Sequence, residues 1–191
     1  MKIFLLLFFS ICFSYSEQNS FEKFQMYMSK EKGRIFGINL DHRNFGKSIT
    51  SSGNLWFFNS KDYVFDSRSE RISNKNNTIT TINKLAKQVI YDNNFESNLD
   101  IINVLGSGEN RIRVLGSFNE KELIRIDFIL VDWYSEGSIW TIPNTGEPKK
   151  ISINISSDEI VDLEINSSKI ISAASLPYID ISEYEIIDLR D

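Results

Sequence analysis

The sequence predicts an α+β protein in which one long antiparallel sheet is accompanied by two or three helices. Three observations lead to this class. Most of the chain alternates apolar and polar residues with a period of two, turn residues recur between the alternating runs, and two short segments carry apolar residues at helical spacing. With 191 residues and no internal repeat, the chain suits a single domain.

Two amphipathic helices are expected. The first begins with Ser20 as its N-cap and ends near Gly33, and the second begins with Ser97 and ends at Gly106. Their apolar faces consist of Phe21, Phe24, Tyr27 and Met28 in the first helix, and of Leu99, Ile102 and Leu105 in the second.

The remaining segments alternate as strands do, and short turns separate them. The expected strands are Arg34–Leu40, Ser48–Phe58, Asp62–Ser67, Glu70–Ser73, Thr78–Asn83, Lys87–Tyr91, Arg111–Leu115, Leu123–Trp133, Ser138–Ile142, Lys150–Ile155, Ile160–Ile165 and Tyr184–Leu189. Turns are expected at Asn44–Gly46 and Asn74–Asn77, and the pair Ser52-Gly53 permits a bulge or a close backbone approach. Ser167–Leu176 is expected to be a looser segment.

Residues 1–16 have the pattern of a cleaved signal peptide. Lys2 supplies the positive start, Ile3–Phe9 is a continuous apolar run, and Ser14-Tyr15-Ser16 provides small residues for cleavage. The apolar run is too short to span a membrane. We therefore expect a secreted mature domain over residues 17–191 that contains no thiol. The alternative is that Cys12, the only cysteine, is a lipidation site.

Composition and motifs argue against several function classes. The net charge of −5 with scattered charges does not suit nucleic acid, which a basic surface would bind. The only histidine, His42, is expected on a turn, so neither a metal site nor a Ser-His-Asp triad is predicted. Gly106-Ser107-Gly108 does not follow a strand, and Asp158-Glu159 suits a solvated turn. We expect no enzymatic activity and no cofactor.

Two segments resemble the outer-membrane lipoprotein carrier family of the periplasm. The first contains Ser52-Gly53-Asn54-Leu55-Trp56-Phe57-Phe58, Tyr63-Val64-Phe65-Asp66, Ile72–Ile79 and Lys87-Gln88-Val89. The second contains Trp140-Thr141-Ile142-Pro143, followed by Lys150–Ile155 and Ile160–Leu163. Together these motifs follow the order of the family's strands over most of the mature chain.

The resemblance implies a strongly curved antiparallel sheet that forms an incomplete β-barrel, covered by a few short helices. It implies a monomeric periplasmic chaperone that binds the acyl chains of lipoproteins, taking them from an inner-membrane donor complex to an outer-membrane acceptor. An arginine associated with closing the lid is common after the first motif strand of the family. Here Asn59 stands at that position, which places a lid latch there in doubt because Asn lacks the guanidinium fork.

Candidate ligand residues follow from these patterns. Leu55 and Phe57 share one face of their strand, Trp56 and Phe58 share the other, and the sequence leaves open which face lines a cavity. The cavity candidates are Leu55, Phe57, Val64, Ile79, Phe128, Leu130, Ile151, Ile153 and Ile155. The lid candidates are Phe21, Phe24, Met28, Leu99, Ile102 and Leu105. An ordinary filled core accounts for the same residues equally well.

Three other functions stay open beside the lipoprotein carrier. The fold could carry another lipid or a glycolipid, the chain could be a secreted structural or adhesion domain with a filled core, or it could be an extracellular hydrolase. A large apolar cavity would separate carriers from the adhesion domain. Clustered carboxylates in a polar cleft would favour the hydrolase.

Overall fold

The computed structural model describes residues 19–29, 33–93, 101–106, 111–171 and 176–190. The predicted signal peptide, Cys12, the predicted cap Ser97 and the lid candidate Leu99 lie outside these residues. No helix in the described ranges is long and apolar enough to cross a membrane.

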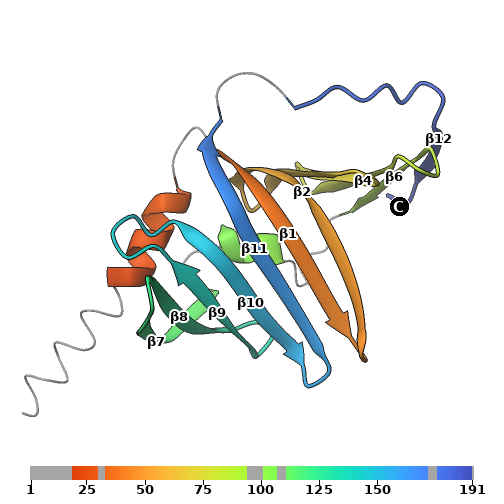
Figure 1. The fold of residues 1–191 in the computed structure, drawn as a ribbon. Coiled ribbons are helices and arrows are strands. Elements are labelled where there is room, and N and C mark those ends of the chain that lie inside the picture. The colour runs from red at the N-terminus through yellow and green to blue at the C-terminus, as the bar shows by residue number, and fades with distance from the viewer. Residues whose placement is uncertain (1–18, 30–32, 94–100, 107–110, 172–175, 191) are drawn as a thin grey trace, which may run out of the picture.

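Twelve strands form one sheet in the order β12-β6-β5-β4-β3-β2-β1-β11-β10-β9-β8-β7. The strands are β1 Arg34–Asn44, β2 Lys47–Asn59, β3 Asp62–Ser67, β4 Glu70–Lys75, β5 Thr78–Asn83, β6 Gln88–Asn93, β7 Ile112–Glu120, β8 Leu123–Leu130, β9 Ser135–Thr141, β10 Pro148–Ser156, β11 Glu159–Ile170 and β12 Glu185–Asp188. The sheet curves strongly (Figure 1), and its edge strands β7 and β12 do not pair with each other. The predicted fold, an incomplete β-barrel, is confirmed.

Two helices accompany the sheet in the described chain. The N-terminal helix covers residues 19–28, and α2 covers Ile101–Leu105. Figure 1 shows α2 in the hollow of the sheet and the N-terminal helix beside the ends of β8–β10. The Lys23 ammonium donates to the Pro143 carbonyl at 3.1 Å. At Gly146, in the turn between β9 and β10, a Cβ would lie 2.3 Å from the Lys23 backbone, so the helix sits directly on that turn.

The main cluster of buried side chains lies on one face of the sheet, which we call the inner face. Trp56, Val64 and Val89 are buried on the opposite face. The register places Phe36 opposite Leu55 and Leu55 opposite Phe65, and Ile151 opposite both Leu163 and Ile139. All these side chains belong to one cluster that also contains Phe21, Phe24 and Met28 of the N-terminal helix and Val104 and Leu105 of α2. Burial of this continuous apolar face is the main force that holds the sheet curved around its helices.

The backbone conformation at the β4–β5 turn and at Gly53 follows from the residue types found there. Asn76 and Asn77 both adopt positive φ in the β4–β5 turn, a conformation that Asn tolerates well. Gly53 does not produce a bulge in the β1–β2 pairing. A Cβ there would lie 2.3 Å from the Asp66 carbonyl oxygen, so this glycine permits a close backbone approach.

Several expectations about secondary structure are wrong. Ser20 lies within the N-terminal helix and does not cap it, and His42 lies in β1 and hydrogen-bonds to Glu159 at 2.8 Å. β11 continues to Ile170 through the expected loose segment because Arg34–Gly37 of β1 pairs with it. β12 is parallel to β6, against the expectation of a wholly antiparallel sheet.

Candidate ligand-binding groove

An apolar groove of about 310 Å³ opens where the N-terminal helix, β2 and α2 meet. Its size is at the lower end of the range of small-molecule sites, about 300–1,000 Å³. The residues lining it are Gln25, Met28, Ser29, Phe57, Phe58, Asn59, Leu105 and Gly106.

Each element reaches the groove for a local reason. Gln25, Met28 and Ser29 share one side of the N-terminal helix because they are three and four residues apart. Phe57 and Phe58 would normally point to opposite faces of β2. A register shift between Phe57 and Asn59 bends the end of that strand, and both aromatic rings then border the groove. Phe57 is buried, whereas Phe58 is 38% exposed.

Glycine allows α2 to close on β2 at the inner end of the groove. A Cβ at Gly106 would lie 2.8 Å from the Ser60 backbone nitrogen and 3.0 Å from the Phe57 ring. Contacts of this kind exclude any larger side chain unless the backbone shifts. The end of α2 therefore packs directly on Phe57 and on the turn between β2 and β3.

Arg34 attaches the N-terminal helix to the sheet beside the groove. Its side chain is on the inner face, only 5% exposed, and pairs in register with Phe57. The Arg34 guanidinium lies 3.5 Å from the centre of the Tyr27 ring, and its Nε donates to the Tyr27 carbonyl at 3.0 Å. The Tyr27 hydroxyl shares a hydrogen bond of 2.7 Å with Ser168 on β11. The helix end is thus held through two neighbouring strands.

The same contacts set the acid–base behaviour of Tyr27. Burial raises the pKa of the Tyr27 phenol above its ordinary value of 10.0, although the Ser168 hydroxyl and the Arg34 charge act in the opposite direction. The phenol consequently remains neutral at physiological pH and keeps its hydrogen bond to Ser168.

Six of the cavity candidates lie buried on the inner face: Leu55, Phe57, Phe128, Leu130, Ile151 and Ile153. Ile79 is half-buried on the same face, and the half-buried Ile155 packs against the core cluster. Val64 is on the opposite face, since it pairs with Trp56. Placing Val64 with Leu55 was therefore wrong, because neighbouring strands pair Leu55 with Phe65. Whether these residues bind a ligand stays a prediction.

The described lid candidates come from both helices and reach the core. Phe21, Phe24, Met28 and Leu105 are buried, and Ile102 packs against the core cluster. The groove brings together Met28 and Leu105 with the cavity candidate Phe57. Asn59 also borders it, but the Asn59 side-chain oxygen accepts a hydrogen bond of 2.8 Å from the Lys61 backbone N–H. Asn59 therefore shapes its own turn.

Sequence reasoning missed two polar residues of the inner face, Arg34 and Asn74. Arg34 alternates with Phe36 and Ile38, and Asn74 is two residues after Ile72, so period two places both among apolar side chains. This alternation is visible in the sequence and could have placed both residues on the inner face. Asn74 was assigned to a turn, whereas β4 extends to Lys75 and only Asn76 and Asn77 form the turn.

The described residues contain no group of three or more His, Cys, Asp or Glu side chains that could hold a metal ion. The groove is bordered by amide, hydroxyl and apolar side chains. Its chemistry is therefore suited to contact with hydrocarbon and to a few neutral hydrogen bonds.

No protein-family model matches the chain. No curated protein matches it either. Among solved structures, an uncharacterized conserved protein from Thermus thermophilus aligns with a TM-score of 0.56 and 7% identity, covering 90% of this chain and 98% of that one. This likeness shows a shared fold.

Two further solved structures align with most of the chain. One is a LolA superfamily protein from Nitrosomonas europaea, with a TM-score of 0.46, 10% identity and coverage of 84% of this chain and 94% of that one. The other is named as a candidate outer membrane lipoprotein-sorting protein domain from Vibrio parahaemolyticus. Its TM-score is 0.47 and its identity 10%, over 82% of this chain and 93% of that one.

Proposed function

We propose that this protein is a periplasmic, non-catalytic carrier that binds the acyl chains of lipoproteins between its helices and the inner face of its sheet. It would receive this cargo from an inner-membrane donor complex and pass it to an outer-membrane acceptor. The observation that carries the proposal is the groove, whose apolar lining leads directly to Phe57 on the buried inner face. The sequence motifs that resemble the carrier family agree with it.

Burial of hydrocarbon alone can supply the binding free energy of such a site, without specific polar contacts. Each buried CH₂ group of an acyl chain contributes about 0.8 kcal/mol. Met28 and Leu105 at the groove can adapt their side chains to different chains, Met especially. Release of the ligand then requires only that the helices move away from the sheet or that a better acceptor competes for the ligand.

A first experiment examines the cargo directly. The mature protein is purified from its periplasm, weighed by native mass spectrometry and extracted with organic solvent. A co-purifying acylated peptide, displaced by about one hydrophobic fluorescent probe per chain, is the expected result. Recovery of a free lipid or glycolipid instead would assign the same fold to another cargo. Recovery of cleaved products would contradict the non-catalytic role.

A second experiment places the ligand in the groove. Gln25→Trp puts a large ring into the groove from the N-terminal helix, and we expect at least a tenfold loss of probe affinity. The matched control is Met26→Trp on the same helix, because Met26 is 69% exposed and does not line the groove. Equal affinities of the two variants would refute binding in this groove.

A filled-core structural or adhesion domain is the second candidate. The observation that favours it is the nearly complete burial of inner-face side chains such as Leu55, Phe128 and Ile151. A protein that is recovered empty and also refuses the probe would select this candidate over the carrier.

A further inference from the structure

Within the part of the chain that the structure describes, Asn74 is a buried amide without a hydrogen-bond partner. It lies on β4 at 1% exposure, and neither its Oδ1 nor its Nδ2 has a partner. Native proteins satisfy the great majority of buried polar side-chain atoms, and each exception requires an explanation. An amide carries both an acceptor and a donor group, so Asn74 lacks both kinds of bond at once.

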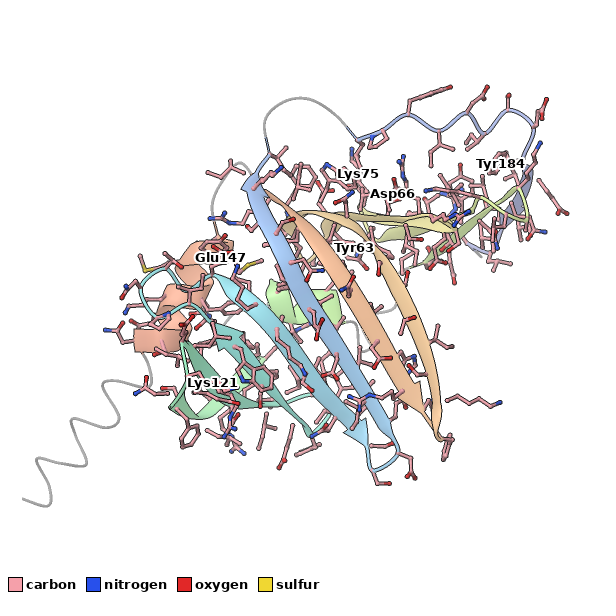
Figure 2. The ribbon with its side chains drawn as sticks, in the orientation of Figure 1. Tyr63, Asp66, Lys75, Lys121, Glu147 and Tyr184 are labelled. Atoms are coloured by element: carbon pink, nitrogen blue, oxygen red, sulfur yellow. The ribbon has the colours of Figure 1, made fainter. Side chains whose placement is uncertain are left out.

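The register places Asn74 in the middle of a row that crosses the inner face. Phe57 on β2 is opposite Tyr63 on β3, Tyr63 is opposite Asn74, and Asn74 is opposite Ile79 on β5, which in turn is opposite Asp92 on β6. Figure 2 labels Tyr63, the member of the row on β3. Because neighbouring strands are about 4.8 Å apart, Asn74 is roughly 10 Å from Phe57 at the groove.

The two ends of this row differ in character. Phe57 and Tyr63 are buried and apolar over most of their surface, and Phe57 borders the groove. Ile79 and Asp92 are half-buried, and Asp92 carries a carboxylate. An amphiphile lying along the row would therefore place its acyl chain towards Phe57 and its headgroup towards Asp92. Its linkage group would then lie at Asn74.

We infer that Asn74 recognises the amide linkage of an N-acyl ligand, an inference that rests on the proposed carrier function. A secondary amide offers one N–H and one C=O, which pair with Oδ1 and Nδ2 of Asn74. An ester offers acceptors only and leaves Oδ1 unpaired. The carboxylate of Asp92 at the other end of the row disfavours an anionic headgroup. The preferred ligand is thus an amide-linked acyl chain with a neutral or cationic headgroup.

The end of α2 packs against the groove end of the row. Gly106 packs against Phe57, the member of the row at the groove. A ligand that enters from the groove must lift this end of α2 before its chain reaches Tyr63 and its linkage reaches Asn74.

The test compares two uncharged probes that differ only in their linkage, N-lauroylethanolamine and 2-hydroxyethyl laurate. Each displaces a hydrophobic fluorescent dye from the mature protein. We expect about a tenfold preference for the amide, the factor that corresponds to 1.4 kcal/mol, within the range of one hydrogen bond. Asn74→Leu, which is similar in size, should bind both probes with the affinity that the wild type has for the ester.

The matched control is Asn54→Leu on the exposed outer side of β2, which should keep the tenfold preference. Circular dichroism and a smaller substitution, Asn74→Ala, separate a loss of selectivity from a loss of folding. Equal binding of both probes by the wild type would overturn the role of Asn74 and leave the carrier function standing. Failure of the wild type to bind either probe would overturn the carrier function and this inference together.

Discussion

Replacing Arg34 by methionine should detach the N-terminal helix from the sheet. The wild-type guanidinium donates to the Tyr27 carbonyl at 3.0 Å and stacks on the Tyr27 ring at 3.5 Å. Hydrogen bonds from charged groups contribute about 1.5–3 kcal/mol, and a desolvated cation–π contact contributes about 2 kcal/mol. Removal of the buried charge, which is costly to desolvate, offsets part of this sum. We expect Arg34→Met to lower the free energy of unfolding by about 2–3 kcal/mol.

The loss is measurable by heat and by hydrogen exchange. For a chain of this size each kcal/mol corresponds to about 2–4 °C, so Tm should fall by roughly 4–12 °C. The backbone amides of the N-terminal helix, residues 19–28, should lose protection before those of the inner strands β1 and β11. Hydrophobic-probe binding should become faster in the same variant, because the helix borders the groove.

Arg43→Met provides the matched control on the same strand. Arg43 pairs with Asp41 and Asp162, its side chain is 47% exposed, and surface pairs contribute little. Its Tm should change by less than half as much as that of Arg34→Met. If both substitutions have equal effects, or if Arg34→Met changes the free energy of unfolding by less than about 0.5 kcal/mol, the assignment of Arg34 is refuted.

Three further predictions concern the outer face, two glycines and the N-terminal helix. Burial alone would raise the pKa of Asp66, but hydrogen bonds from Arg71 and Lys84 outweigh it and hold that pKa below 3.8. Asp66→Asn should therefore cost about 3 kcal/mol at pH 7. In urea titrations that cost should shrink as the pH falls from about 5 towards the depressed pKa, because the wild-type carboxylate gains its proton. Gly53→Ala meets the Asp66 carbonyl and should cost about 2–3 kcal/mol, whereas Gly46→Ala, with positive φ and open space, should cost about 1 kcal/mol by the same assay. The pKa of Tyr27 is raised in the folded state. The Tyr27 hydroxyl therefore contributes fully to the free energy of unfolding below pH 10, and this contribution falls as the pH rises through the folded-state pKa. The stability advantage of wild type over Tyr27→Phe should accordingly decrease above pH 10.

The strands were predictable because their signal is local. Alternation and turn residues located β3 and β5 at the observed bounds, and Asn76 and Asn77 form the expected turn. Where partners override local preference, prediction failed. The Asn166-Ser167-Ser168 stretch has weak strand propensity, yet β11 continues through it because it pairs with β1 and supplies Ser168 to Tyr27.

The candidate site was predictable in its residue types but not in its arrangement. Met28, Phe57 and Leu105 were candidates from the sequence, and the groove brings them together. Their meeting depends on the packing of two helices against β2, which no local pattern specifies. The face on which Val64 lies was likewise not predictable from the sequence, because it depends on the register in which β3 pairs with β2. The parallel pairing of β12 with β6 joins segments nearly one hundred residues apart.

The contacts of Asn59 and Arg34 bear on how the N-terminal helix is held beside the groove. The resemblance to the carrier family places a lid arginine at the position of Asn59, where the side chain instead completes a turn through Lys61. A buried arginine nevertheless stands nearby, since Arg34 pairs in register with Phe57, two residues before Asn59. A guanidinium reaching from β1 holds a helix carbonyl and an aromatic ring together, which an Asn amide cannot do. The arginine that fastens the helix is therefore on β1, and an Asn59→Arg substitution should add little stability while Arg34 is present.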